Sequence, residues 1–155
     1  MSDLREILGK MERYCAGQER CEQDVRLKLA PFALPSVQLE DIIGRLKASD
    51  FLNETRYTEI FVRSKLKDQW GKLKIRQALS SKRIAPETID GIVNGIDAEQ
   101  YSNMLAETIA KWLRLHPEDP VNGRAKLIRA MLAKGFSIDE VMSALREQNG
   151  VKSPF

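Results

Sequence analysis

The chain has 155 residues, of which 43% are hydrophobic and 30% are charged, and its formal net charge is +3. This length fits one ordinary domain or a short array of small modules, and so mild a positive charge says little by itself about partners. No run approaches the ~18 apolar residues of a membrane span, and residues 1–6 are too polar for the apolar part of a secretory signal. We therefore expect a cytoplasmic protein that makes no membrane contact.

The two cysteines, Cys15 and Cys21, lie six residues apart, and His116 is the only histidine. These residues match no zinc-ligand spacing, and a disulfide between cysteines so close in sequence would close a trivial loop. We expect reduced thiols, no bound metal and no cofactor.

One apolar pattern occurs three times along the chain. Anchored at Val25, Ile75 and Leu127, which are 50 and 52 residues apart, seven aligned positions are apolar in every copy. They are Ile7, Met11, Val25, Leu29, Leu34, Leu39 and Ile43 in the first copy, Tyr57, Phe61, Ile75, Leu79, Ile84, Ile89 and Val93 in the second, and Ile109, Leu113, Leu127, Met131, Phe136, Val141 and Leu145 in the third. Steps of four residues keep side chains on one helix face and the longer steps cross turns, so each copy predicts three short helices.

In chain order the predicted helices cover residues 4–15, 22–30 and 37–49, then 54–69, 72–81 and 86–96, then 98–116, 124–134 and 138–148. Asn53 can cap the start of the fourth helix, and Asp97 with Gln100 and Ser137 with Glu140 have the spacing of capping boxes. Cys21, Gly71 and Gly123 fall at the N-caps of the second helices of the three copies.

The fold class that follows is all-α, with three tandem three-helix repeats of helix-turn-helix character forming an elongated, curved array. Repeat 1 covers residues 1–49, repeat 2 residues 50–96 and repeat 3 residues 97–148, with a C-terminal tail at 149–155. The Pro- and Gly-containing segment 116–123 is a connector. Such arrays offer extended surfaces and usually bind partners rather than catalyse reactions.

Positive charge is concentrated in the middle copy. Residues 53–84 contain nine basic and three acidic residues, so their net charge is 9 − 3 = +6. The net charge of the rest of the chain is therefore 3 − 6 = −3. The nine are Arg56, Arg63, Lys65, Lys67, Lys72, Lys74, Arg76, Lys82 and Arg83. At ~100° per residue, Arg56, Arg63 and Lys67 fall within a narrow arc of one helix, and Lys72 and Arg76 share a face of the next. These residues predict a basic stripe for phosphates or an acidic protein surface, whereas the plainer interpretation is a solvated helix face.

Trp70 and Gly71 stand at the junction between those two helices. The free N–H groups at the start of the helix that follows could hold an anion. Trp70 is either a packing anchor or a platform on which a ligand stacks, and packing is the commoner role of an aromatic residue at a helix start. A second, weaker basic group follows in the third copy, at Arg124, Lys126, Arg129 and Lys134.

No catalytic constellation is found in the sequence. There is no G-x-x-x-x-G-K-[ST] phosphate loop, the lone histidine in a Leu-His-Pro context is a poor general base, and Glu22, Asp24, Glu40 and Asp41 have the pattern of solvent-facing carboxylates. We expect that the chain is not an enzyme.

Two central segments carry a resemblance to a known family. Residues 50–65 (DFLNETRYTEIFVRSK) and 70–79 (WGKLKIRQAL) closely resemble the central signature of the RecX regulatory proteins. Residues 14–16 and 20–29 (RCEQDVRLKL) are similar to the first repeat of that family, and residues 124–137 (RAKLIRAMLAKGFS) to its third. The resemblance covers about residues 10–147, and its central part is the most specific.

The resemblance implies a bacterial cytosolic protein of three tandem three-helix repeats without enzymatic activity. Family members bind the RecA recombinase, chiefly its filament on single-stranded DNA, and restrain its ATPase, strand exchange and filament growth. They thereby limit recombination and the DNA-damage (SOS) response. We expect a monomer that binds the RecA filament, with weak, salt-sensitive contact to single-stranded DNA. The candidate partner-binding residues are Arg56, Arg63, Lys65, Lys67, Trp70, Gly71, Lys72, Lys74, Arg76, Arg83, Arg124 and Lys126.

The alternative is a direct DNA-binding protein of helix-turn-helix type. Readers of base sequence need Arg, Asn or Gln near the start of a recognition helix. The third helices of the three copies instead open with Val37-Gln38-Leu39, Pro86-Glu87-Thr88 and Ile138-Asp139-Glu140. Base-specific readout is therefore disfavoured, although binding to phosphates remains open.

Overall fold

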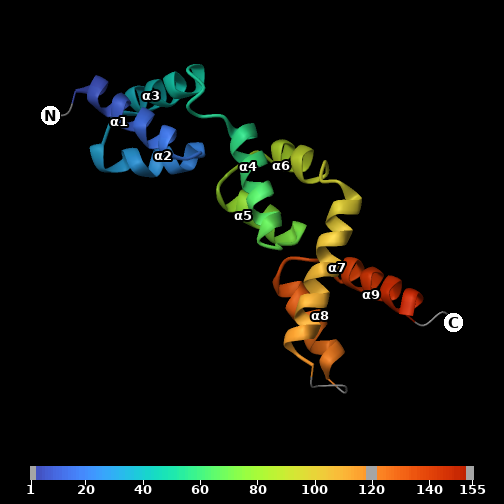
Figure 1. Cartoon of the computed structure of the whole chain (residues 1–155). Coiled ribbons are helices and arrows are strands. Elements are labelled where there is room, and N and C mark those ends of the chain that lie inside the picture. The colour runs from blue at the N-terminus through green and yellow to red at the C-terminus, as the bar shows by residue number, and fades with distance from the viewer. Residues whose placement is uncertain (1–2, 118–121, 153–155) are drawn as a thin grey trace. The chain divides into compact units, whose positions relative to one another are not determined.

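The computed structural model describes residues 3–117 and 122–152, and all regular structure within these ranges is helical (Figure 1). Repeat 1 contains α1 (Leu4–Gly17), α2 (Glu22–Leu29), the 3-10 turn η1 (Ala30–Phe32) and α3 (Ser36–Ala48). Repeat 2 contains α4 (Glu54–Lys67), α5 (Lys72–Ser81) and α6 (Pro86–Val93), and repeat 3 contains α7 (Ala98–Leu115), α8 (Gly123–Ala133) and α9 (Ile138–Lys152). The all-α fold of three three-helix repeats is therefore confirmed, whereas the curved course of the array and the residue limits of the repeats stay predictions.

Most helix ends differ from the predicted ones by one to four residues, as three examples show. Helix α6 ends at Val93, where i→i−3 hydrogen bonds from Gly95 N to Ile92 O and from Ile96 N to Val93 O replace the α-helical pattern. Helix α8 begins at Gly123, so Asn122 and not Gly123 is its N-cap. Helix α9 continues to Lys152, so the beginning of the expected tail is helical. Residues 153–155 of the tail and residues 118–121 of the connector lie outside the described ranges.

Side-chain caps fix the starts of several helices as their sequence predicts. Asn53 Oδ1 accepts a hydrogen bond from the N–H three residues ahead at 2.9 Å, and Asp97 Oδ2 does the same at 2.9 Å. Ser137 and Glu140 form a complete capping box, in which Ser137 Oγ accepts from Glu140 N at 3.1 Å and Glu140 Oε1 accepts from Ser137 N at 2.8 Å. Each such cap is worth ~1 kcal/mol of helix stability.

A left-handed residue lies eight positions after the anchor in every repeat. Ala33, Arg83 and Gly135 have φ of 49°, 60° and 102°. The N–H of the next residue, Ile84 or Phe136, then donates to the carbonyl five residues earlier at 3.1 or 3.2 Å, which ends the second helix of that repeat. Only Gly135 adopts this backbone conformation without a steric cost, so the turn is visible in the sequence of one repeat out of three.

Contact density divides the chain into two compact units, one within residues 1–61 and 79–89 and one within residues 62–78 and 90–155. In the first unit α1, α2 and α3 pack together (Figure 1), around a core that includes Ile7, Met11, Val25, Leu29 and Ile43. In the second unit α7, α8 and α9 enclose Tyr101, Leu105, Ile109, Leu127, Met131, Phe136, Val141 and Leu145. The anchors Val25, Ile75 and Leu127 are at most 3% exposed, so the apolar pattern identifies the buried faces.

Leu113 is the clear exception to that pattern. It is 41% exposed, whereas the neighbouring Trp112 packs against the core of the third repeat. At ~100° per residue, Leu113 lies ~100° from the middle of the face formed by Tyr101, Leu105 and Trp112. The pattern places Ile109 and Leu113 on this helix, and one step of four residues turns Leu113 ~40° further from the middle of the buried face than Ile109.

Candidate partner-binding surface

The start of α5 is attached to the turn between α8 and α9. Gly71 N donates to Lys134 O at 2.7 Å and Leu73 N donates to Gly135 O at 3.0 Å. A Cβ placed on Gly71 would lie 2.2 Å from the carbonyl carbon of Gly135, so only glycine permits this approach of two backbones. Gly71 is buried. The expectation that free N–H groups at this helix start hold an anion is therefore wrong, because the third repeat already accepts their hydrogen bonds.

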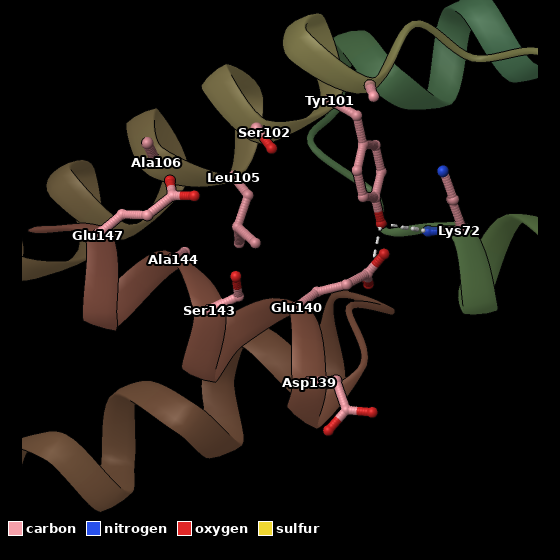
Figure 2. Close-up of a pocket in the computed structure, with 11 residues that line it drawn as sticks. Lys72, Tyr101, Ser102, Leu105, Ala106, Asp139, Glu140, Ser143, Ala144 and Glu147 are labelled. Atoms are coloured by element: carbon pink, nitrogen blue, oxygen red, sulfur yellow. Dashed lines mark hydrogen bonds between the residues drawn. The ribbon is translucent and has the colours of Figure 1, made fainter.

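Tyr101 completes this attachment (Figure 2). Its hydroxyl oxygen accepts a hydrogen bond from Lys72 N at 2.9 Å and donates to Glu140 Oε1 at 3.3 Å. Burial raises the pKa of Tyr101 well above its usual value, so the hydroxyl stays protonated and can donate. The ammonium of Lys72 lies over the Tyr101 ring, 4.5 Å from its centroid. The one sequence signal for Tyr101 is its position, because Tyr57 and Tyr101 are each the fourth residue of the first helix of their repeat.

Trp70 is half-buried between two lysines of the same compact unit. Lys65 Nζ lies 4.6 Å and Lys74 Nζ 4.2 Å from the centroid of the indole. Trp70 N also donates to Lys65 O at 3.0 Å, which closes the turn after α4. Two ammonium groups over one ring are attracted by its π electrons and hold it in place. This geometry favours the packing role of Trp70 over that of an open platform.

The outer face of α4 carries Arg63 and Lys67, one helical turn apart. Both side chains are exposed, and neither forms an ion pair within the described residues. Lys65 lies ~200° around the helix from Arg63, on the side that contacts Trp70. We call the set Arg63, Lys65, Lys67, Trp70, Lys72 and Lys74 the basic corner, because its members flank the turn between α4 and α5.

Two predicted members of the stripe are instead held in ion pairs. Arg56 binds Glu19 at 2.6 Å and Asp50 at 2.7 Å. Arg76 binds Asp90 at 2.5 Å, and its second terminal nitrogen donates to Asn94 Oδ1 at 2.6 Å. The nine basic residues of the middle copy therefore do not form one continuous stripe, because acidic residues outside residues 53–84 neutralise part of the block.

Lys82 is neutralised in the same way by Asp24, at 2.7 Å. The Asp24 side chain is only 14% exposed, so the expectation that it faces solvent is wrong. Burial opposes ionisation of this carboxyl, but hydrogen bonds from Lys82 and from Cys21 N, at 3.2 Å, outweigh it and lower the pKa of Asp24. Both cysteines are free and buried.

Glu54 lies beside this pair and accepts a hydrogen bond from the first N–H of α2, Glu22 N, at 2.7 Å. Its other carboxylate oxygen is buried and has no partner within the described residues. Burial, helped by the neighbouring carboxylate of Glu22, raises the pKa of Glu54. Glu22 itself is bound to Lys47 at 2.6 Å and to Arg26 at 3.0 Å, so it is not a free surface carboxylate either.

The remaining candidates lie apart from the basic corner in sequence. Arg83 is exposed and occupies the left-handed position of the turn after α5. Arg124 and Lys126 are exposed at the start of α8. No helix in residues 3–117 or 122–152 has both the length and the apolar character needed to cross a membrane.

Comparison with known proteins relates this chain to a protein family. A family model described as RecX, second three-helix domain, matches residues 53–91, which contain α4, α5, most of α6 and the whole basic corner. The regulatory protein RecX of Leptothrix cholodnii is 30% identical over 142 residues, which cover 90% of this chain and 87% of the relative. That of Herminiimonas arsenicoxydans is 28% identical over 136 residues, covering 86% and 87%.

Solved structures show the same fold. The crystal structure of RecX from Lactobacillus salivarius aligns with a TM-score of 0.84 over 93% of this chain and 95% of that one, at 22% identity. Another crystal structure of a regulatory protein RecX aligns with a TM-score of 0.83 over 92% and 73%, at 23% identity. Sequence and fold agree, and this chain belongs to the RecX family of regulatory proteins.

Proposed function

We propose that this chain is a non-catalytic, cytoplasmic regulator that binds the RecA filament on single-stranded DNA. Through this binding it inhibits the ATPase of RecA, strand exchange and filament growth, and so limits recombination and the DNA-damage response. Family membership supports this proposal, since the curated relatives are named regulatory proteins.

The basic corner is the observation that supports the filament as target. Arg63 and Lys67 are exposed and Lys74 is half-buried over Trp70, and none of the three has an acidic partner among the described residues, although ion pairs neutralise Arg56 and Arg76 nearby in sequence. Cations that lack an acidic partner attract phosphates and acidic protein surfaces, and their contribution falls as salt increases. A nucleoprotein filament offers both kinds of target along its length.

A charge-reversal series tests the proposal. The triple variant Arg63→Glu, Lys67→Glu and Lys74→Glu changes the net charge from +3 to 3 − 6 = −3. We expect the concentration of this variant that half-inhibits the DNA-dependent ATPase of RecA to be about tenfold higher or more, because both electrostatic attraction during association and direct charge contacts are lost.

The matched control is the triple variant Arg5→Glu, Arg13→Glu and Lys111→Glu. These three residues are exposed, lie outside the basic corner, and give the same net charge of −3 when reversed. The control should inhibit almost as well as the unaltered chain, with circular dichroism showing that both variants fold. Equal inhibition by the two triples would remove the basic corner from the mechanism.

Direct binding to DNA is the second candidate, and the third helices argue against its sequence-specific form. The first turns of α6 and α9 carry Glu87, Asp139 and Glu140, which repel phosphates at the position where a recognition helix enters the groove. Tighter binding to naked DNA than to RecA filaments, with a dependence on base sequence, would favour this candidate instead.

A further inference from the structure

A groove of about 580 Å³ lies between α7 and α9 on the second compact unit (Figure 2). Its α7 wall carries small side chains at four-residue spacing, Ala98, Ser102 and Ala106. Leu105 and Tyr101, which are 3% and 6% exposed, form its apolar base. Because the small residues leave room above a buried apolar base, a further helix can approach this surface closely.

The groove is acidic, and it shares only Lys72 with the basic corner of the same unit. Three carboxylates of α9, from Asp139, Glu140 and Glu147, line it together with one cation, Lys72. Glu140 is fixed by hydrogen bonds from Ser137 N and Tyr101, whereas Asp139 and Glu147 are exposed and form no ion pair with a described residue. The carboxylates of Asp139 and Glu147 can therefore pair with positively charged side chains of a ligand.

We propose that this acidic groove binds an amphipathic helix of a protein partner, whose lysine or arginine side chains pair with Asp139 and Glu147. The inference rests on the function proposed above, under which the helix belongs to a RecA protomer in the filament. An apolar base with charged rims is the usual receptor for an amphipathic helix, and the carboxylates exclude a phosphate backbone from it. The groove therefore contacts protein, and the basic corner is the surface that faces phosphates or acidic side chains.

Two pairs of matched variants test the groove. Ser102→Trp fills it, whereas Asn103→Trp places the same bulk on the adjacent exposed position of α7, which does not line the groove. Asp139→Lys reverses a groove charge in the first turn of α9, whereas Glu99→Lys makes the same change in the first turn of α7 outside the groove. The two members of each pair introduce the same residue at a similar helix position.

The first measurement uses a synthetic 18-residue helical peptide of leucine and lysine, with a leucine and glutamate peptide of equal length as control. The chain should bind the lysine peptide, and Ser102→Trp and Asp139→Lys should each weaken this binding about tenfold or more, whereas their partners change it less than about twofold. No preference for the lysine peptide, or equal loss in both members of a pair, overturns the proposal.

The second measurement repeats the four variants as inhibitors of the RecA ATPase on single-stranded DNA. Selective loss with Ser102→Trp and Asp139→Lys supports a RecA helix as the occupant, and full inhibition by both overturns it. If the unaltered chain does not inhibit RecA, the proposed function fails, while the peptide measurement still decides the chemistry of the groove. Ultracentrifugation shows whether the chain forms a dimer. A dimer that does not bind the lysine peptide would mean that a second copy of the chain occupies the groove, and would overturn the proposal.

Discussion

Replacing Gly71 by alanine should detach the start of α5 from the third repeat. The new methyl group would lie 2.2 Å from the carbonyl carbon of Gly135 and 2.3 Å from its oxygen and from Phe136 N. All three are backbone atoms, which cannot move aside by changing a rotamer. The turn between α8 and α9 must therefore shift away from α5.

The size of the effect follows from the contacts that this shift breaks. Three hydrogen bonds are made by the N–H groups of Gly71, Lys72 and Leu73 at 2.7, 2.9 and 3.0 Å. At ~1 kcal/mol each they contribute about 3 kcal/mol, and overpacking adds ~1 kcal/mol or more. A total of about 4 kcal/mol corresponds to a melting temperature lower by roughly 8–16 °C in a chain of this length.

Thermal and urea unfolding followed by circular dichroism measure this loss, with Gly44→Ala and Gly91→Ala as controls. A Cβ on either of these helical glycines meets no atom within 4 Å. Both controls should be more stable than the unaltered chain, by up to ~1 kcal/mol, because alanine is the better helix former. A Gly71→Ala protein that melts within 2 °C or so of the unaltered chain would refute the close backbone approach.

Three further predictions concern polar contacts. Asp24→Asn should lower the free energy of unfolding at neutral pH, and the difference should shrink as pH falls below about 4, because a depressed carboxyl pKa stabilises the fold only while the group is ionised. Glu54→Gln should act in the opposite direction. The raised pKa of Glu54 means that its ionised form is unfavourable in the fold, so the unaltered chain loses stability as pH rises through and above 4.5. The glutamine amide removes that loss, and its oxygen can still accept the hydrogen bond from Glu22 N. Urea unfolding between about pH 2 and 7.5 measures both, and parallel pH profiles for the two variants would contradict them. Tyr101→Phe should cost about 1–2 kcal/mol in the same assay, because Lys72 N loses its acceptor, and an unchanged midpoint would show that water replaces the hydroxyl.

The helices were predictable because local patterns specify them. Apolar side chains recur at helical spacing around Val25, Ile75 and Leu127, and capping residues such as Asn53 and Ser137 act over three residues of the chain. Leu113 shows where such a rule fails, since a fixed spacing drifts off the buried face of a long helix. The left-handed turns at Ala33 and Arg83 were invisible because neither residue is glycine.

The surface was harder to predict because charge neutralisation is a tertiary property. Arg56 and Lys82 count as free cations in the sequence, but their partners Glu19 and Asp24 are 37 and 58 residues away. Gly71 stood out as a candidate for contact with a partner, and the structure shows that it permits a backbone approach within the chain itself. Asp139 and Glu147 gave no signal, because an acidic groove forms only when α7 and α9 pack together.

The most direct test of the central claim is a comparison of two equilibrium affinities in one buffer. The unaltered chain is titrated into a labelled single strand of DNA, either naked or coated with RecA and a non-hydrolysable ATP analogue. We predict markedly tighter binding to the RecA-coated strand, with an affinity that falls as salt rises. Equal or tighter binding to the naked strand would contradict regulation through the filament.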